Sequence, residues 1–157
     1  MKNLAISIAL ASLLGGAPAF AQAIPDFSGS WELNPSKGEN LGMMAAVKES
    51  LTISQTEAEL SIAFTDVFGG NTTTRQVTYD LGGDPVTNFA AMGEQSETVA
   101  AWVDDTLVVT WTSEGAIAGT TVERTETRSL SDDGFTMTVT SVRGSKPPTV
   151  MVYEKRE

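Results

Sequence analysis

The strongest constraint on this chain is a repeated two-residue alternation of apolar and polar side chains. It occurs in "LTIS" (residues 51–54), "ELSIAF" (59–64), "TLVVTW" (106–111) and "FTMTVT" (135–140). Successive side chains of a β-strand point to opposite faces of the sheet, so this pattern is typical of strands with one buried face. The twenty threonines of the chain favour strands as well.

Together with "AWV" (101–103) and "ETRSL" (126–130), these segments form three pairs with short polar turns between them. The turns are "QTEA" (55–58), Asp104-Asp105 and "SDDG" (131–134), an arrangement that predicts hairpins in an antiparallel meander. Further strands are expected at residues 30–33, 73–79 and 149–154, which makes nine or ten in all. Only "ENLGMMAAVKE" (39–49) looks helical, with Leu41, Met44 and Ala45 on one face.

Strand pairing can be predicted from the turns. The turn at Asp104-Asp105 pairs Trp102 with Leu107, Ala100 with Val109 and Thr98 with Trp111. The turn at 131–134 pairs Leu130 with Phe135, and the first hairpin pairs Ile53 with Leu60. Each pairing gathers apolar residues on one face. We therefore expect an all-β fold, an antiparallel meander closed into a barrel that removes the open sheet edges.

Residues 1–23 have the layout of a cleaved secretory signal peptide. Lys2 precedes an apolar run (4–14), and two overlapping Ala-x-Ala signals follow at 19–21 and 21–23. The run is too short to span a bilayer. We expect a periplasmic or secreted protein in which residues 24–157 form one domain.

Charge and composition exclude several classes of function. Without Lys2 the net charge is 9 − 20 = −11, which disfavours nucleic acid and anionic membranes as partners. The chain has no cysteine and no histidine, so it has no disulfide, no Ser-His or Cys-His nucleophile and no imidazole metal ligand. Asp104-Asp105 and Asp132-Asp133 lie at predicted turns, where aspartate is common. No cofactor or metal is expected.

Both ends of residues 24–157 resemble a known family. "FSGSWEL" (27–33) resembles the first strand of the calycin barrels and is similar to the Phe-x-Gly-x-Trp-x-Leu start of the fatty-acid-binding proteins. "VYEK" (152–155) resembles their closing strand, and "TRSLSDDGFTMTV" (127–139) their penultimate hairpin. The resemblance implies a lipocalin-like barrel in which Gly29 allows close backbone approach and Trp31 plugs the base. The alternative is a β-sandwich with an ordinary core tryptophan.

The resemblance also implies part of a ligand site. Members of the family bind a ligand carboxylate with two inward arginines and a tyrosine. Arg128 matches the first arginine and Tyr153 the tyrosine, but Met151 stands where the second arginine would be. The helical lid of the family has only residues 40–48 available. The chain is thus closer to lidless, lipocalin-like periplasmic proteins.

The segment "VERTETRSL" (122–130) places charges inside the predicted barrel. Arg124, Glu126 and Arg128 share its inner face, and a buried charge needs a partner. Glu126 compensates only one arginine. On this strand alone, one surplus positive charge remains. It must be solvated by water, or balanced by another carboxylate such as Glu49 or by an anionic group of a ligand.

Three functions are compatible with these observations. The favoured one is a carrier of a small apolar or amphipathic ligand. The alternative is a non-enzymatic interaction or scaffold protein with a solid-cored barrel, and a cofactor-free isomerase or cyclase using Glu126, Arg128 and Tyr153 is less favoured. The residues expected to hold an apolar ligand are Phe64, Trp102, Trp111, Met137 and Met151.

Overall fold

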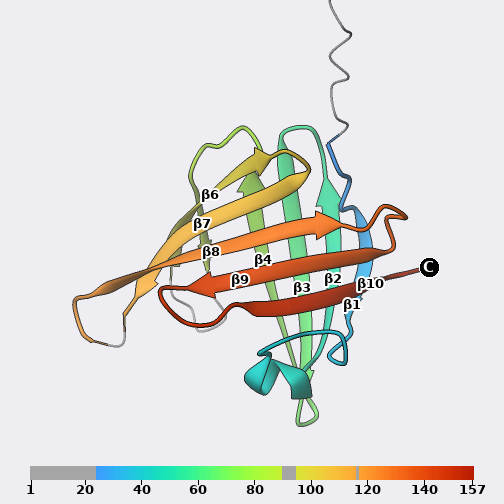
Figure 1. Cartoon of the computed structure of the whole chain (residues 1–157), viewed down its shortest axis with the longest axis horizontal. Helices are drawn as coiled ribbons and strands as arrows, with labels where there is room; N and C mark the ends of the chain where they lie inside the picture. Colours follow the sequence, from blue (N-terminus) through green and yellow to red (C-terminus); the bar gives the residue numbers. More distant parts are fainter. Residues whose placement is uncertain (1–23, 90–94, 116) are drawn as a thin grey trace, which may run out of the picture.

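The computed structural model describes residues 24–89, 95–115 and 117–157, which form ten strands and one short helix (Figure 1). The predicted signal peptide, residues 1–23, lies outside the described residues. No helix of the described ranges is long and apolar enough to cross a membrane. The elements are β1 (Gly29–Leu33), η1 (Gly42–Ala46), β2 (Lys48–Gln55), β3 (Glu59–Phe68), β4 (Asn71–Asp80), β5 (Val86–Phe89), β6 (Gln95–Val103), β7 (Thr106–Glu114), β8 (Thr121–Leu130), β9 (Thr136–Arg143) and β10 (Thr149–Arg156).

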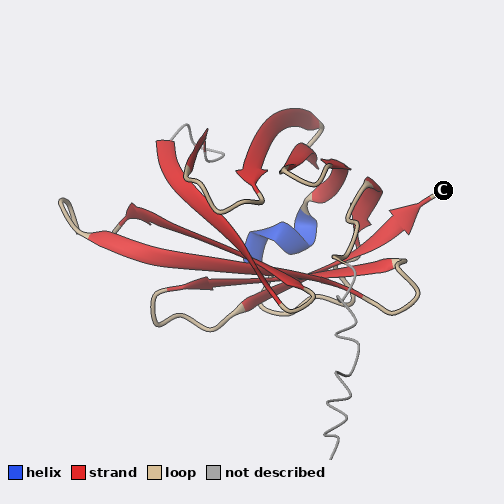
Figure 2. Ribbon diagram, turned by 90° about the horizontal axis from the view of Figure 1, so that it is seen from above, coloured by secondary structure: helices blue, strands red, loops and turns tan. Residues whose placement is uncertain are grey.

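All ten strands belong to one antiparallel sheet, in the order β4-β3-β2-β1-β10-β9-β8-β7-β6-β5. The first and last strands therefore lie side by side, and the sheet curls around an interior (Figure 2). This confirms the predicted meander and barrel. The 3-10 helix η1 lies across one end of it (Figure 1).

A side chain bridges the two edge strands β4 and β5. Asn88 on β5 accepts a hydrogen bond from the backbone N of Thr78 on β4 at 2.9 Å, and its Nδ2 donates to the carbonyl oxygen of Thr78 at 2.8 Å. Nδ2 also lies 2.6 Å from Oγ1 of Thr98. Between β4 and β5, the side-chain amide of Asn88 makes hydrogen bonds of the kind that backbone groups make between the other neighbouring strands. The barrel is therefore nearly closed.

The predicted pairing of β6 with β7 is confirmed. Trp102 pairs with Leu107 and Thr98 with Trp111. Asp104, in the two-residue turn, has φ of 56°, a left-handed conformation that aspartate tolerates better than most residues.

The predicted pairing of β8 with β9 is wrong by two residues. Leu130 pairs with Met137 instead of Phe135. The connection is longer than a four-residue turn because Asp133 Oδ1 accepts hydrogen bonds from Phe135 N, at 3.0 Å, and from Ser131 Oγ, at 2.6 Å. The exposed Phe135 therefore belongs to the loop.

The pairing of β2 with β3 differs from the prediction in the same way. Ile53 pairs with Ile62 instead of Leu60, because the turn closes through a backbone bond from Thr56 N to the carbonyl oxygen of Glu59 at 2.8 Å. Shifts by two residues leave every side chain on its predicted face, so the inward set is unchanged.

The predicted helical segment contains only the five residues of η1. Leu41 is buried and Met44 packs against the core, but Ala45 is exposed, contrary to the prediction. Lys48 and Glu49 already belong to β2. Where the resemblance implies a helical lid, this chain has one 3-10 turn of five residues.

One end of the barrel is closely packed. Trp31 and Phe27 are fully buried, and the indole nitrogen of Trp31 donates to the carbonyl oxygen of Phe27 at 2.9 Å. The Phe27 ring stacks on Trp102 with a centroid distance of 5.9 Å. Gly29 has φ of 131°, and a Cβ there would lie 2.8 Å from Cε of Lys155. We call this cluster of Phe27, Trp31 and Trp102 the packed end.

Candidate functional site

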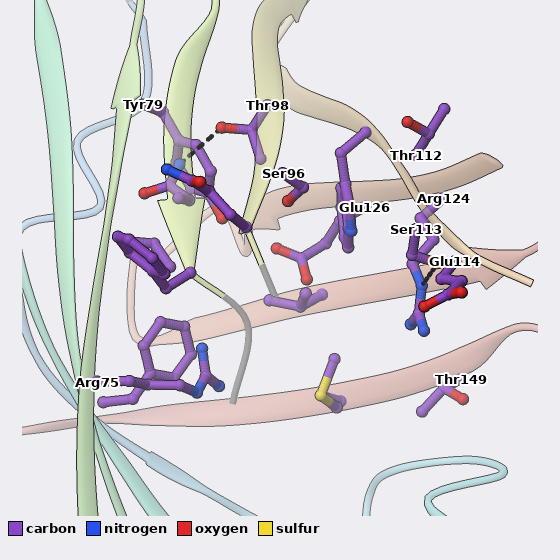
Figure 3. Close-up of a pocket in the computed structure, with 18 of the residues that line it drawn as sticks. Arg75, Tyr79, Ser96, Thr98, Thr112, Ser113, Glu114, Arg124, Glu126 and Thr149 are labelled. Atoms are coloured by element: carbon purple, nitrogen blue, oxygen red, sulfur yellow. Dashed lines mark hydrogen bonds between the residues drawn. The ribbon is translucent and has the colours of Figure 1, made fainter. Parts of the chain in front are cut away.

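Beyond the packed end the barrel encloses a cavity of about 850 Å³. Binding sites for small molecules commonly have volumes of ~300–1,000 Å³. Side chains from nine strands, β2 to β10, line the cavity (Figure 3). The described part of the barrel is therefore hollow rather than solid-cored.

Most of the residues predicted to bind a ligand line this cavity. Trp102 and Met137 do not line it. Trp102 stacks on Phe27 at the packed end, and Met137 is fully buried in the core. The predicted residues on the cavity wall are Phe64, Trp111, Arg124, Glu126, Arg128, Met151 and Tyr153.

Arg128 and Glu126 form an ion pair on β8, in which the arginine is buried and the glutamate is partly exposed. They are two residues apart and share the inner face, and Nη2 of Arg128 donates to Oε1 of Glu126. Arg128 is 2% exposed, so it is not a solvated arginine at an open barrel end. Among the described residues, its Nε and Nη1 have no hydrogen-bond partner. Burial opposes the charge of Arg128, but Glu126 and the nearby tyrosines raise its pKa above the ordinary value.

A second ionic group, on β2 and β4, was not predicted as a site. Glu49 is 2% exposed, and its Oε2 lies 3.5 Å from Nη2 of Arg75. The hydroxyl of Tyr153 donates to Oε1 of Glu49 at 2.5 Å. The guanidinium carbon of Arg75 lies 3.4 Å from the ring centroid of Phe64, an arrangement that stabilises a cation over an aromatic face.

Glu49 has an unusual electrostatic environment. Burial raises its pKa to about 7, against the opposing effect of the hydrogen bond from Tyr153, and neighbouring Asp66 adds to the rise. Asp66 is paired with Glu49 across β2 and β3. Its Oδ1 is buried and has no hydrogen-bond partner within the described ranges. Burial likewise raises the pKa of Tyr79 to about 12.

Arg124 lies on the opposite side of the cavity from Arg75. Its Nε donates to Oγ of Ser113 at 2.9 Å, and Figure 3 shows it beside Ser113 and Glu114. The cavity wall thus has three arginines and three glutamates, the third being Glu114. The surplus positive charge predicted from β8 disappears because other strands contribute Glu49 and Glu114.

The site residues that sequence analysis missed had a detectable signal. Arg75, Val77 and Tyr79 alternate along a strand that the sequence predicts. Since Val77 and Tyr79 are apolar or aromatic, the alternation places Arg75 on the same inner face, where the structure has it. Glu49 was considered only as a counter-charge, because the predicted helix extended to residue 49.

Nothing in the described ranges suggests a metal centre. No group of three or more potential metal-ligating side chains occurs in them. The carboxylates of Asp104-Asp105 and Asp132-Asp133 lie in the β6–β7 and β8–β9 connections.

Comparison with known proteins identifies the fold. No family model and no curated protein matches the sequence. Among solved structures, a protein described as the REP1-NXSQ fatty acid transporter matches with a TM-score of 0.65 and 14% identity, over 83% of this chain and 96% of that one. Fatty-acid-binding protein 1 of Echinococcus granulosus matches with a TM-score of 0.63 and 13% identity, over 83% and 98%.

A Schistosoma mansoni fatty acid binding protein in complex with arachidonic acid also matches, with a TM-score of 0.63 and 15% identity, over 83% of this chain and 96% of that one. The fold is therefore that of the fatty-acid-binding proteins, a calycin-type barrel.

Proposed function

We propose that this barrel binds a small apolar or amphipathic molecule in its cavity, with the polar head group at Arg128. The observation that carries the proposal is a buried guanidinium, two of whose nitrogens have no partner in the described residues, at the wall of a cavity of about 850 Å³. The solved structures with this fold include a fatty acid transporter and a complex with arachidonic acid.

The head group must contain an acceptor oxygen. A buried N–H group left without a partner costs about 1–3 kcal/mol, and more when it is charged. A carboxylate can accept from two guanidinium nitrogens at once. The apolar walls formed by Phe64, Val77, Trp111, Val139 and Met151 are suited to an alkyl chain.

The test compares a fatty acid with its methyl ester. Removing Arg128 alone would leave the carboxylate of Glu126 in the cavity wall without its partner, so the informative variant is Arg128→Met combined with Glu126→Gln. Because charge-assisted hydrogen bonds contribute about 1.5–3 kcal/mol, the acid should bind roughly ten- to a hundredfold more weakly, while the ester changes little.

The matched control is Glu126→Gln alone, which keeps the guanidinium and should keep acid binding. Equal losses for acid and ester in the double variant would contradict the head-group site. A parent protein that retains no amphiphile in native mass spectrometry, and binds neither compound, would contradict the carrier function itself.

The proposed carrier acts in the periplasm or outside the cell, as the pattern of residues 1–23 predicts. The exported protein should then begin at Gln22 or Ile24. N-terminal sequencing of exported material that still finds Met1 would remove this assignment.

A further inference from the structure

The inner part of the cavity already has more carboxyl groups than cations. Arg75 pairs with Glu49 and Arg128 pairs with Glu126, and Asp66 lies opposite Glu49 on the neighbouring strand. The head group of a bound acid would be a fourth carboxylate among two guanidinium groups. Opposite charges must balance closely in a poorly solvated interior, so an acid that enters as an anion is expected to alter the protonation of its surroundings.

Glu49 is placed to accept a proton. Directly opposite residues of an antiparallel pair have Cβ atoms about 4.5–5.5 Å apart, and Asp66 is the residue opposite Glu49. In the described part of the chain, Oδ1 of Asp66 lacks a hydrogen-bond donor. A proton on the Glu49 carboxyl would supply that donor, while Tyr153 continues to donate to Oε1 of Glu49.

Several other charged and titratable groups lie around Glu49. They come from β4 (Arg75 and Tyr79), β8 (Glu126 and Arg128) and β10 (Tyr153), besides Asp66 on β3. Lys48, its neighbour on β2, is exposed. The arginines stay charged and the buried tyrosines stay neutral, because burial raises the pKa of both Tyr79 and Tyr153. Glu126 is bonded to Arg128. Glu49, whose pKa burial raises to about 7, is the group that titrates near neutrality.

We propose that Glu49 determines how this cavity accepts acidic ligands: it takes up one proton when the acid binds, so the acid and the proton bind together. The charged groups around Glu49, counted together with the bound acid, then have the same net charge as before binding. This inference rests on the proposed binding of amphiphiles. It adds that the affinity for acids depends on pH, whereas the affinity for neutral analogues does not.

Coupled binding of the acid and a proton predicts how the affinity for the acid changes with pH. A carboxylic acid free in water is ionised above about pH 6, so the proton must come from solution. At pH values well above the pKa of Glu49, where one full proton is taken up, the affinity for the acid falls about tenfold for each pH unit. A neutral analogue adds no charge, and its affinity should not follow pH.

The experiment titrates the full chain with decanoic acid and with decanol. Between about pH 7 and about pH 8, the Kd of the parent protein for decanoic acid should rise about fivefold, because about half of Glu49 is already protonated at pH 7, while the Kd for decanol stays within about twofold. Calorimetry in two buffers of different ionisation enthalpy should show proton uptake with the acid only. Glu49→Gln should still bind the acid, but with neither the pH dependence nor the proton uptake.

Asp66→Asn is the matched control. It keeps Glu49 but removes a group that raises its pKa, so the pH dependence should persist at lower pH. Proton uptake that survives in Glu49→Gln and disappears in Asp66→Asn would overturn the proposal by placing the proton on Asp66.

The outcomes separate this inference from the function on which it rests. If the parent binds neither decanoic acid nor decanol, the carrier function fails. If it binds both with the same pH profile, only the role of Glu49 fails. Should the Glu49→Gln protein not fold, NMR of the Glu49 carboxyl in the parent decides: decanoic acid must raise its titration midpoint and decanol must not.

Discussion

The packed end and the cavity of this barrel belong to one curled sheet and differ in which side chains point inward. At the packed end the inward residues are large and apolar, and Phe27 and Trp31 are fully buried. In the cavity they include Arg75, Arg128 and Glu49. Apolar side chains fill an interior to the density of a crystal, whereas charged ones are held by their partners and need polar surroundings.

The boundary between the two regions runs across strands rather than between them. On β8, Leu130 packs against the core, while Arg128 and Arg124 line the cavity. On β10, Tyr153 touches both regions, since it belongs to the core cluster and donates to Glu49. A change of residue type along one strand is thus enough to turn a solid interior into a hollow one.

Trp31→Ala should produce the largest effect, because it removes the centre of the packed end. Truncating a buried aromatic residue costs about 3–5 kcal/mol, a large part of the stability of a small domain. Urea denaturation measures the loss. A change below about 1 kcal/mol, as at a surface position, would show that Trp31 does not plug the barrel.

Trp111→Ala is the matching substitution in the cavity wall and sharpens the contrast. Trp111 is only partly buried, so its truncation enlarges an existing cavity, and we expect a loss of about 1 kcal/mol. Ligand affinity should fall more than stability. Equal losses of stability in the two tryptophan variants would abolish the distinction between the two regions.

The second prediction concerns the pH dependence of stability. In the folded protein, burial raises the pKa of Glu49 from its ordinary value of 4.5 to about 7. Between these values the folded protein binds a proton that the unfolded chain has released, so stability is lost as pH rises from about 4.5 to about 7, by on the order of 3 kcal/mol. The packed end has no comparable group.

The check is the free energy of unfolding of the ligand-free protein at several pH values, compared with Glu49→Gln. The difference in the free energy of unfolding between the two proteins should change between about pH 4.5 and about pH 7 and level off above pH 7. Identical pH profiles would mean that Glu49 titrates normally in the fold.

A further effect is expected at the wall of the cavity, where Asn88 bridges β4 and β5. Asn88→Ala removes its hydrogen bonds to Thr78 and Thr98, which should cost about 1–3 kcal/mol. Hydrogen exchange of the Thr78 amide should become faster. The exposed Asn71, at the other end of β4, is the control: its replacement by alanine should change stability by less than about 0.5 kcal/mol. Unchanged exchange at Thr78 would show that backbone contacts alone close the barrel.

Much of the fold could be predicted from the sequence because strand geometry is local. The two-residue alternation identified nearly all of the strands and their inner faces, including Arg124, Glu126 and Arg128 on one face of β8. The short β5, four residues without a clear alternation, was missed. The register errors came from turns whose length depends on particular hydrogen bonds, such as those of Asp133.

Which residues face inward can be predicted from local sequence, because the direction of a side chain follows from its position along an extended strand. Which of these inward side chains contact one another depends on the folded barrel. Tyr153 donates to Glu49 across 104 residues of sequence, and Arg75 reaches the same carboxylate from β4. Such contacts depend on how the sheet curls and on the stagger of its strands. Those are properties of the whole barrel. They explain why neither the cavity nor the pairing of Glu49 with Asp66 was evident from any single strand.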